Sequence, residues 1–309
     1  MNVALIGSVS SSWYALDALI RSGVEVACVC GVDESRAKQI GDYRSLRELA
    51  GQAAIPFLSF VKVGEPEVEN FLSEHKPDML WVIGLSQLVP QRLIDIASGG
   101  GVGFHPTMLP KGRGRAPVAW TILLGEPAAA NLFYLTDQPD AGDIIIQREV
   151  LVGPDDYSED LIRRTNKVLA EAIVELAGSI KTGALPRTPQ DHSRATYYKK
   201  RTPADGLIDW NTTTDRIYRL IRAASRPYPG AFSHIGGAKV IVWRATPAGS
   251  EDALSPVQPG LIVRTGAEKG TLVKTGDGGL WLDEVEVEHT REVHDRDPLG
   301  VGRVFQETA

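Results

Sequence analysis

Short apolar runs alternate with longer segments of helical spacing along the first part of the chain. The longer segments place apolar residues three and four positions apart, as one face of a helix does. Strands are predicted for the apolar runs at residues 2–7, 24–32, 55–60 and 78–85, and one of the helices between them is predicted at 43–54. Alternation of this kind is typical of a parallel sheet with helices on both faces. The pattern therefore predicts an α/β, Rossmann-like domain with a mostly parallel sheet.

The same alternation continues past the fourth strand and places one histidine at a strand end. Helices are predicted at 90–98, 116–125 and about 158–180, and strands at 100–106, 129–137 and 144–152. His105 then lies at the carboxyl end of a strand. Ligands of open α/β sheets bind at that edge, so the surroundings of His105 are the first candidate site.

Beyond residue 180 the periodicity stops. Residues 181–207 are rich in proline, threonine and charge without a sustained period, as is typical of a connector. One amphipathic helix follows, and then strands separated by glycine turns at 239–245, 260–266, 270–276 and 278–288. These predict a small antiparallel, OB-like β-barrel. We expect a catalytic domain at 1–184, a connector at 185–204 and a C-terminal domain of helix plus barrel at 205–309.

Composition and charge narrow the function classes. The 309 residues are 43% hydrophobic with a formal net charge of −6, which fits a soluble enzyme. Negative net charge argues against a protein that mainly grips phosphate backbones, because that binding is chiefly electrostatic. No apolar run approaches the roughly 18 residues of a membrane span, and the first residues lack a basic leader. We expect a cytoplasmic protein with neither a membrane nor a nucleic-acid partner.

The neighbours of His105 set it apart from the other histidines of the chain. Gly101 and Gly103 precede it, and Pro106 follows it directly. Glycines allow the backbone to approach a ligand closely, and proline fixes the direction in which the chain leaves. These neighbours therefore favour a segment that exposes the imidazole of His105 to a ligand.

Three carboxylates lie in the segment TDQPDAGD, in a loop between two predicted strands of the same sheet. They are Asp137, Asp140 and Asp143. A carboxylate beside an imidazole orients the ring and raises its basicity, as general acid/base chemistry near neutral pH requires. Loop aspartates also cap turns, so sequence distance alone leaves both interpretations open.

The segment FHPTMLPKGRGRAPVAW, followed by DAGDII, resembles the folate-dependent formyltransferases. That family contains methionyl-tRNA formyltransferase, glycinamide ribonucleotide formyltransferase and the sugar N-formyltransferases. Its pattern is asparagine, any residue, histidine and a Ser-Leu-Leu-Pro-like stretch, followed later by Asp-x-Gly-Asp. By this resemblance His105 matches the catalytic histidine and Asp140 the catalytic aspartate. RATYYKKRTPADGLIDW extends the resemblance into the second domain, as in the two-domain sugar N-formyltransferases.

The resemblance implies formyl transfer from 10-formyltetrahydrofolate to a primary amine, without a metal. The neutral amine attacks the formyl carbon, and His105 and Asp140 pass a proton from the amine to the departing folate nitrogen. The resemblance also places the pterin between the loop after the fourth strand and the TDQPDAGD loop. The corresponding residues are Ser86, Gln87, Leu88, Val89 and Asp137. Leu88 and Val89 serve equally well as plain core residues.

One position departs from the family pattern, because Gly103 stands where the family carries asparagine. In the family that amide is taken to stabilise the oxyanion formed during attack, a task that glycine has no side chain to perform. A backbone N–H or protonated His105 replaces it, another amide such as Asn131 or Gln87 does, or activity is lost. Asn131 is included among the catalytic candidates because it begins the strand that leads to Asp140.

Basic residues and hydroxyls near the candidate site favour a substrate that carries phosphate. The KGRGRAP stretch resembles that of the sugar N-formyltransferases, and its cations suit a diphosphate. Hydroxyls at the first strand–helix turn, together with helix N-terminal amides, suit a phosphate or a sugar. The candidates are Lys111, Arg113, Arg115 and Ser10. A solvated basic turn is the alternative interpretation of the three cations.

The leading hypothesis is an N-formyltransferase that acts on a nucleotide-linked amino sugar. The second domain argues against the purine-pathway enzymes of the family, and the net charge of −6 weakens the case for methionyl-tRNA formyltransferase. The latter remains an alternative, as does a non-catalytic folate or sugar-nucleotide binding module that lost the asparagine. Exposed barrel strands also allow a homodimer.

Overall fold

The computed structural model describes residues 1–252, 256–266, 270–288 and 299–306. Contacts divide these residues into two compact units. The first contains Met1–Thr121, Pro127–Val152 and Leu161–Lys199, and the second contains Ile122–Glu126, Gly153–Asp160 and the described residues from Lys200 onward. The division before Lys200 falls inside the connector expected at 185–204.

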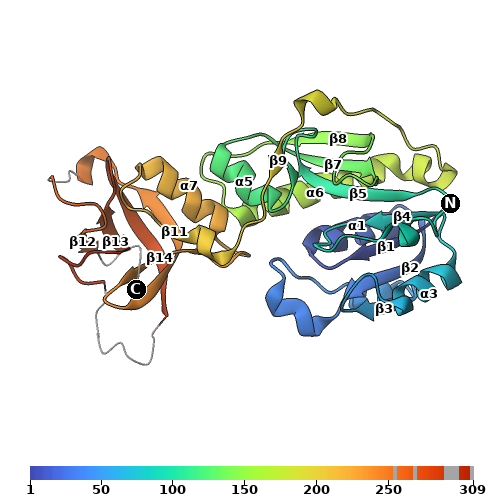
Figure 1. Cartoon of the computed structure of the whole chain (residues 1–309), viewed down its shortest axis with the longest axis horizontal. Helices are drawn as coiled ribbons and strands as arrows, with labels where there is room; N and C mark the ends of the chain where they lie inside the picture. Colours follow the sequence, from blue (N-terminus) through green and yellow to red (C-terminus); the bar gives the residue numbers. More distant parts are fainter. Residues whose placement is uncertain (253–255, 267–269, 289–298, 307–309) are drawn as a thin grey trace. The chain divides into compact units, whose positions relative to one another are not determined.

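A seven-stranded sheet forms the centre of the first unit, in the order β3-β2-β1-β4-β5-β7-β8. Its strands are β1 (Asn2–Gly7), β2 (Glu25–Val32), β3 (Phe57–Phe60), β4 (Met79–Val82), β5 (Gly101–Thr107), β7 (Ala128–Tyr134) and β8 (Ile144–Val150). Strands β1 to β5 pair in parallel, whereas β7 and β8 run antiparallel to their neighbours. The predicted Rossmann-like, mostly parallel sheet is confirmed, and Figure 1 shows it among its helices.

Helices cover both faces of this sheet. One face packs against α1 (Ser10–Arg21), α2 (Arg47–Gln52) and the inner face of α6 (Ser158–Thr182). The other face packs against α3 (Pro66–His75) and the short α4 (Gln91–Ile94). The remaining helix that begins in this unit is α5 (Pro117–Leu124), and one 3-10 turn covers Glu34–Gln39.

Side-chain alternation along β1 shows why the sequence gives a two-sided sheet. Val3 and Leu5 belong to the core cluster beneath α1 and α6, and Ala4 and Ile6 belong to the cluster beneath α3 and α4. All of these side chains are fully buried. A strand covered on both faces must be apolar at every position, and each buried leucine or isoleucine contributes about 1.5–3 kcal/mol.

The helix expected at 43–54 is shorter in the structure. Asp42 has a φ of 63°, and Tyr43 forms a bridge with Val9, so the chain is still extended there. The backbone N–H of Arg44 donates to the carbonyl oxygen of Ser8. Because these groups pair with the end of β1, α2 begins only at Arg47.

A second, two-stranded sheet in the first unit was not predicted. It pairs β6 (Arg113–Gly114) in parallel with β9 (Tyr197–Tyr198), which lies in the segment interpreted as a connector. A 3-10 turn at His192–Arg194 precedes β9. Strands of two residues carry no periodicity, so the sequence pattern gave no signal for them.

The second unit combines α7 (Thr214–Ala224) with a five-stranded antiparallel sheet in the order β10-β11-β14-β13-β12. The strands are β10 (Ala231–Ile235), β11 (Ala238–Pro247), β12 (Ile262–Gly266), β13 (Gly270–Lys274) and β14 (Gly279–Glu288), with 3-10 turns at Pro203–Gly206 and Ser250–Asp252. Gln306 bridges to His234 on β10, and Val304 bridges to Leu261 beside β12. The chain end thus links the two edge strands, which gives the sheet the closed character expected of a barrel.

Among the described residues, no helix is both long enough and apolar enough to cross a bilayer.

Candidate active site

His105 lies near the carboxyl end of β5 and is 4% exposed. Its Nε2 is 2.8 Å from the carbonyl oxygen of Gly112. Because a carbonyl oxygen can only accept, Nε2 carries a proton and donates it to this hydrogen bond. The bond fixes the orientation of the ring and leaves Nδ1 as the nitrogen that can accept or release a proton.

Asp140 faces this second ring nitrogen. Its Oδ2 lies 3.5 Å from Nδ1 of His105 and accepts a hydrogen bond of 2.8 Å from the backbone N–H of Gly114. Asp140 has a φ of 56°, in the left-handed region that residues other than glycine seldom adopt. The bend turns the carboxylate toward the imidazole, so the structure brings together the two residues matched to the family motif.

Asn131 lies on β7 next to His105 but faces the backbone of β5. Its side chain is fully buried, and Nδ2 donates to the carbonyl oxygens of His105 and Thr107. Its Oδ1 accepts a hydrogen bond of 2.6 Å from Nε2 of Gln147. Both amide hydrogens are therefore used inside the protein, which leaves none for a substrate oxygen. Through these hydrogen bonds, Asn131 holds β5, the strand that carries His105.

The asparagine of the family pattern would fit at Gly103 only if neighbouring side chains moved. A Cβ atom added there would lie 2.7 Å from Cζ of Phe133 and 2.8 Å from Cδ2 of Leu135. Both distances are shorter than van der Waals contact. The missing amide is thus replaced by apolar packing from the neighbouring strand β7 and its following loop.

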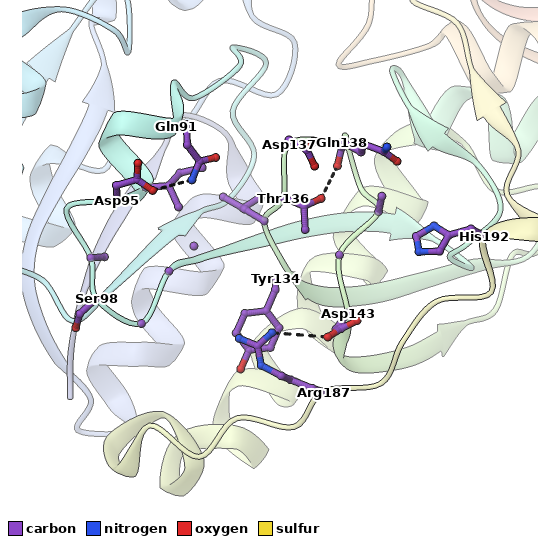
Figure 2. A pocket seen from close by; sticks show the side chains of 18 residues that line it. Gln91, Asp95, Ser98, Tyr134, Thr136, Asp137, Gln138, Asp143, Arg187 and His192 are labelled. Atoms are coloured by element: carbon purple, nitrogen blue, oxygen red, sulfur yellow. Dashed lines mark hydrogen bonds and ion pairs between the residues drawn. The ribbon is translucent and has the colours of Figure 1, made fainter.

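A cavity of about 620 Å³ lies beside the Asp140 loop in the first unit. Figure 2 shows its polar wall, where Thr136, Asp137 and Gln138 stand opposite Gln91 and Asp95 of the α4 segment. Its remaining lining comes from the turn into β5, from the loop after β7 and from the segment after α6. These residues are Ile94, Ala97, Ser98, Gly99, Gly100, Gly101, Tyr134, Leu135, Ala141, Gly142, Asp143, Arg187 and His192.

Aspartates outnumber arginines among the residues that line the cavity. Nη1 of Arg187 lies 3.7 Å from Oδ2 of Asp143, and its guanidinium stacks 3.5 Å from the centre of the Tyr134 ring. Figure 2 draws this ion pair on the wall of the cavity. Asp95 and Asp137 add two further carboxylates, so the lining favours a ligand that donates hydrogen bonds.

Only one of the five residues expected to hold the pterin lines this cavity. Asp137 does, whereas Ser86, Gln87, Leu88 and Val89 do not. Gln87 instead accepts from the backbone N–H of Val63 at 2.8 Å and donates to the carbonyl oxygen of Val61 at 3.0 Å. Leu88 is 85% exposed, and Val89 packs against the core cluster beneath α3.

The three cations of the KGRGRAP stretch have different environments. Lys111 and Arg115 are exposed, and no ion pair of either side chain is found within the described residues. Arg113 is 1% exposed, and its Nη2 donates 2.7 Å to Oε1 of Gln190. Lys111 and Arg115 are therefore available to an anionic ligand, whereas Arg113 is built into the protein interior.

Ser10 lies at the amino end of α1, where a phosphate was expected. Its backbone N–H is 3.2 Å from Oδ2 of Asp42, and its hydroxyl donates to the same oxygen. Nδ2 of Asn166 donates 2.7 Å to the Ser10 hydroxyl. An anion placed here would meet the Asp42 carboxylate, so this helix end is already capped by the chain itself.

In the part of the chain that the structure describes, no three His, Cys, Asp or Glu side chains gather as a metal ion requires. Cys28 and Cys30 are free and fully buried on β2, and burial raises the pKa of Cys28 to about 12. A thiol that stays protonated is not a nucleophile at neutral pH.

Several residues around the site were missed by sequence reasoning. Gln190 and Thr196 lie in the apparent connector, yet they bond to the segments that carry Asp140 and Gly112. The α4 segment and the glycine run 99–101 form one side of the cavity. The three consecutive glycines at the start of a strand could have indicated the cavity. No sequence pattern marks the connector residues.

Family comparison agrees with this geometry. Residues 1–176 match the family described as "Formyl transferase", and residues 200–299 match "Formyl transferase, C-terminal domain". Residues 177–199 lie between the two matches. A curated methionyl-tRNA formyltransferase from Geotalea uraniireducens is 30% identical over 303 residues, which cover 97% of this chain and 94% of that protein.

Solved structures share the fold at lower identity. An N-formyltransferase from Helicobacter canadensis, in complex with folinic acid and dTDP-3-aminofucose, is 15% identical with a TM-score of 0.65, covering 91% of this chain and 98% of that chain. HypX from Aquifex aeolicus, in complex with tetrahydrofolic acid, is 20% identical with a TM-score of 0.68, covering 94% of this chain. The present chain spans 44% of the length of HypX. With family models matching both of its units, the chain belongs to the formyl transferase family and is a folate-dependent formyltransferase.

Proposed function

We propose that the chain transfers a formyl group from 10-formyltetrahydrofolate to the primary amine of a nucleotide-linked amino sugar. The observation that carries this proposal is the meeting of His105 and Asp140, with 3.5 Å between Nδ1 and Oδ2. Other residues of the loop that carries Asp140 line a cavity of about 620 Å³. Acyl transfer to an amine needs a group that moves a proton and a concave place for the acyl donor. The first unit contains both.

His105 and Asp140 move the proton in this proposal. The amine nitrogen bonds to the formyl carbon while the bond from that carbon to N10 of the folate breaks, so one proton passes from the amine to N10. Nδ1 of His105 takes and returns it, because Nε2 is held by Gly112. Asp140 stabilises the imidazolium formed in between. Such acid/base catalysis contributes about 10²–10⁴-fold to a rate.

Protonated His105 also balances the negative charge that develops on the formyl oxygen. Such charge needs a donor fixed in place before the reaction. The amides of Asn131 and Gln87 are engaged with backbone groups, and apolar side chains surround Gly103. Among the side chains considered as replacements for the missing asparagine, we therefore assign this task to the imidazolium of His105.

The pterin of the folate occupies the cavity beside the Asp140 loop. Ile94 and Leu135 offer apolar contacts, and Asp137 accepts hydrogen bonds from ring N–H groups. The cavity volume falls in the usual range for small-molecule sites, roughly 300–1,000 Å³. 10-Formyltetrahydrofolate supplies the formyl carbon and, through N10, the leaving group.

A nucleotide-linked amino sugar is supported by charge. Lys111 and Arg115 flank the short segment that holds the His105 ring, and both side chains are exposed, so they suit a diphosphate. The Helicobacter canadensis structure, of which this chain covers 98%, contains a nucleotide-linked amino sugar together with folinic acid. The net charge of −6 disfavours an acceptor as large and negative as tRNA.

Methionyl-tRNA is the second candidate. It is favoured by the Geotalea uraniireducens relative, which is 30% identical along 94% of its own length. Against it stands the formal net charge of −6, because binding to a phosphate backbone is chiefly electrostatic.

The test is a formyl-transfer assay with 10-formyltetrahydrofolate and a panel of amines. The panel contains dTDP- and UDP-linked 3-amino and 4-amino sugars and charged initiator tRNA, with products identified by mass spectrometry. We expect one nucleotide sugar to gain a formyl group. Formylation of the tRNA alone would establish the second candidate instead. Folate binding without transfer to any amine would identify a binding module.

A further inference from the structure

The segment between the two family matches contacts both halves of the proposed catalytic pair. We call residues 188–199 the clamp segment; all of them belong to the first unit. We propose that two residues of the clamp segment, Gln190 and Thr196, hold the formyl-transfer site in place and that Gln190 is the positioning residue for Asp140. This inference rests on the proposed function.

Gln190 holds the Asp140 loop through two hydrogen bonds. Its Nε2 donates 2.9 Å to the carbonyl oxygen of Asp140 and 2.7 Å to that of Gly142, and the residue is 6% exposed. The loop needs such support, because Asp140 has a φ of 56°. A residue other than glycine keeps this conformation only where its surroundings enforce it. Gln190, which lies far along the chain, stabilises this conformation of Asp140 through the two hydrogen bonds.

Arg113 determines which way the Gln190 amide points. Its Nη2 donates 2.7 Å to Oε1 of Gln190 and lies 3.2 Å from Nδ1 of His192, and its Nη1 donates 3.2 Å to the hydroxyl of Tyr197. A guanidinium has only donors, so it must face the amide oxygen and turn the NH₂ group toward the loop. The buried cation thereby fixes the donor end of Gln190 on Asp140 and Gly142.

The clamp segment also holds the partner of the imidazole. The backbone N–H of Gly112 donates 2.9 Å to Oγ1 of Thr196, and the backbone N–H of Arg113 donates 2.9 Å to the carbonyl oxygen of Thr196. The carbonyl oxygen of Gly112 accepts from Nε2 of His105. One segment therefore sets the position of the ring, through Gly112, and of the carboxylate, through Gln190. The 3.5 Å spacing between them depends on it.

The proposal is tested with two substitutions at Gln190 and one control. Gln190→Leu removes both the donor and the acceptor of the side chain. Gln190→Glu keeps an oxygen for Arg113 but can no longer donate to the Asp140 loop. Ser193→Ala is the control, because the exposed Ser193 hydroxyl bonds to Asp191 within the same segment and not to the site.

Kinetics should separate positioning from binding. We expect kcat of Gln190→Leu and Gln190→Glu to fall about 10- to 100-fold, since a displacement of about 1 Å at reacting groups has effects of this size. The KM values for folate and amine should change less than twofold, and the pH profile of kcat should shift. Ser193→Ala should match the unchanged chain. Wild-type kcat and pH profile in either Gln190 variant would overturn the proposal.

A second measurement needs no substrate. NMR of ¹³C-labelled histidine follows the titration of His105 directly, and we expect its midpoint to move in both Gln190 variants and not in Ser193→Ala. A shifted midpoint in a chain that transfers formyl to no amine would sink the proposed function and keep the positioning role. An unshifted midpoint in two folded Gln190 variants would remove the positioning role, whatever the activity.

Discussion

The carboxyl ends of β5 and β1 lie on the same edge of one parallel sheet, yet they offer different chemistry. At the end of β5, Nδ1 of His105 faces Asp140 at 3.5 Å, a distance too long for a strong hydrogen bond. At the end of β1, the N–H and hydroxyl of Ser10 are both donated to Asp42. The first end keeps a proton-accepting nitrogen available, and the second has used its donors.

This difference shows that the order of strands in a sheet indicates where a site lies. It does not show which polar groups at that site are free to bind a ligand or accept a proton. His105 was expected at the site because it lies at the carboxyl end of a predicted strand. Ser10 was expected there because the hydroxyls and amides of the first strand–helix turn suit a phosphate or a sugar. Only the tertiary partners separate them. Asp42 reaches Ser10 from the segment before α2, whereas Oδ2 of Asp140 faces His105 and also accepts from the Gly114 N–H.

The largest effect is expected at His105. His105→Ala removes the group that moves the proton, so kcat/KM for formyl transfer should fall by about 10²–10⁴-fold. Thermal unfolding measured on the same sample checks that the fold survives. A kcat/KM within threefold of that of the unchanged chain would show that His105 does not move the proton. It would contradict the contrast drawn between the ends of β5 and β1.

Asp140→Asn tests the other half of the β5 site. An asparagine keeps the shape and can still accept from the Gly114 N–H, but it cannot balance a protonated imidazole. We expect kcat to fall about 10- to 100-fold, less than the roughly 10²–10⁴-fold of an acid/base group itself, because the imidazole is retained. The folate dissociation constant, measured by fluorescence, should stay within threefold. A loss confined to folate binding would assign Asp140 to the cavity instead.

Gly103→Asn, which restores the residue of the family pattern, should destabilise the chain. Its Cβ would lie 2.7 Å from Cζ of Phe133, and overpacking of this kind costs about 1–3 kcal/mol of unfolding free energy. Denaturant titration measures the loss. The double variant Gly103→Asn with Phe133→Ala should lose less than the sum of the two single changes. Additive losses would show that Phe133 does not fill the place of the asparagine.

The smallest effect is expected at the end of β1. Ser10→Ala deletes hydrogen bonds to Asp42 and Asn166, which should lower the unfolding free energy by about 1 kcal/mol. The KM for the amine should change less than twofold, because the Ser10 donors already serve the chain. A tenfold rise in this KM with unchanged stability would place the phosphate of the substrate at the α1 end after all.

Much of the fold followed from the spacing of apolar residues. The strands around β1 and β4 were predicted because buried parallel strands are continuous apolar runs, as in NVALIG and DMLWVIGL. The pair β6 and β9 was missed because each strand has two residues. The early part of the predicted helix at 43–54 was wrong because Tyr43 bridges to Val9, a tertiary contact that overrides local spacing.

The site was predictable as far as local motifs reach. His105 and Asp140 stand in recognisable segments, and the bend at Asp140 brings them together. Gln190 lies 77 positions from Arg113 in a stretch without periodicity, so nothing local marks their hydrogen bond. Nothing in the local sequence indicates that the side chains of Asn131 and Arg113 are buried and hydrogen-bonded. The burial of a polar side chain depends on tertiary packing and not on its own segment.

A double-mutant cycle between His105 and Asp140 tests the central claim most directly. It measures kcat/KM for formyl transfer in the unchanged chain, His105→Ala, Asp140→Asn and the double variant. If the carboxylate acts only through the imidazole, the double variant should be no slower than His105→Ala, within about threefold. A double variant whose loss equals the product of the two single losses would show that the residues act independently, and would contradict a catalytic pair at the end of β5.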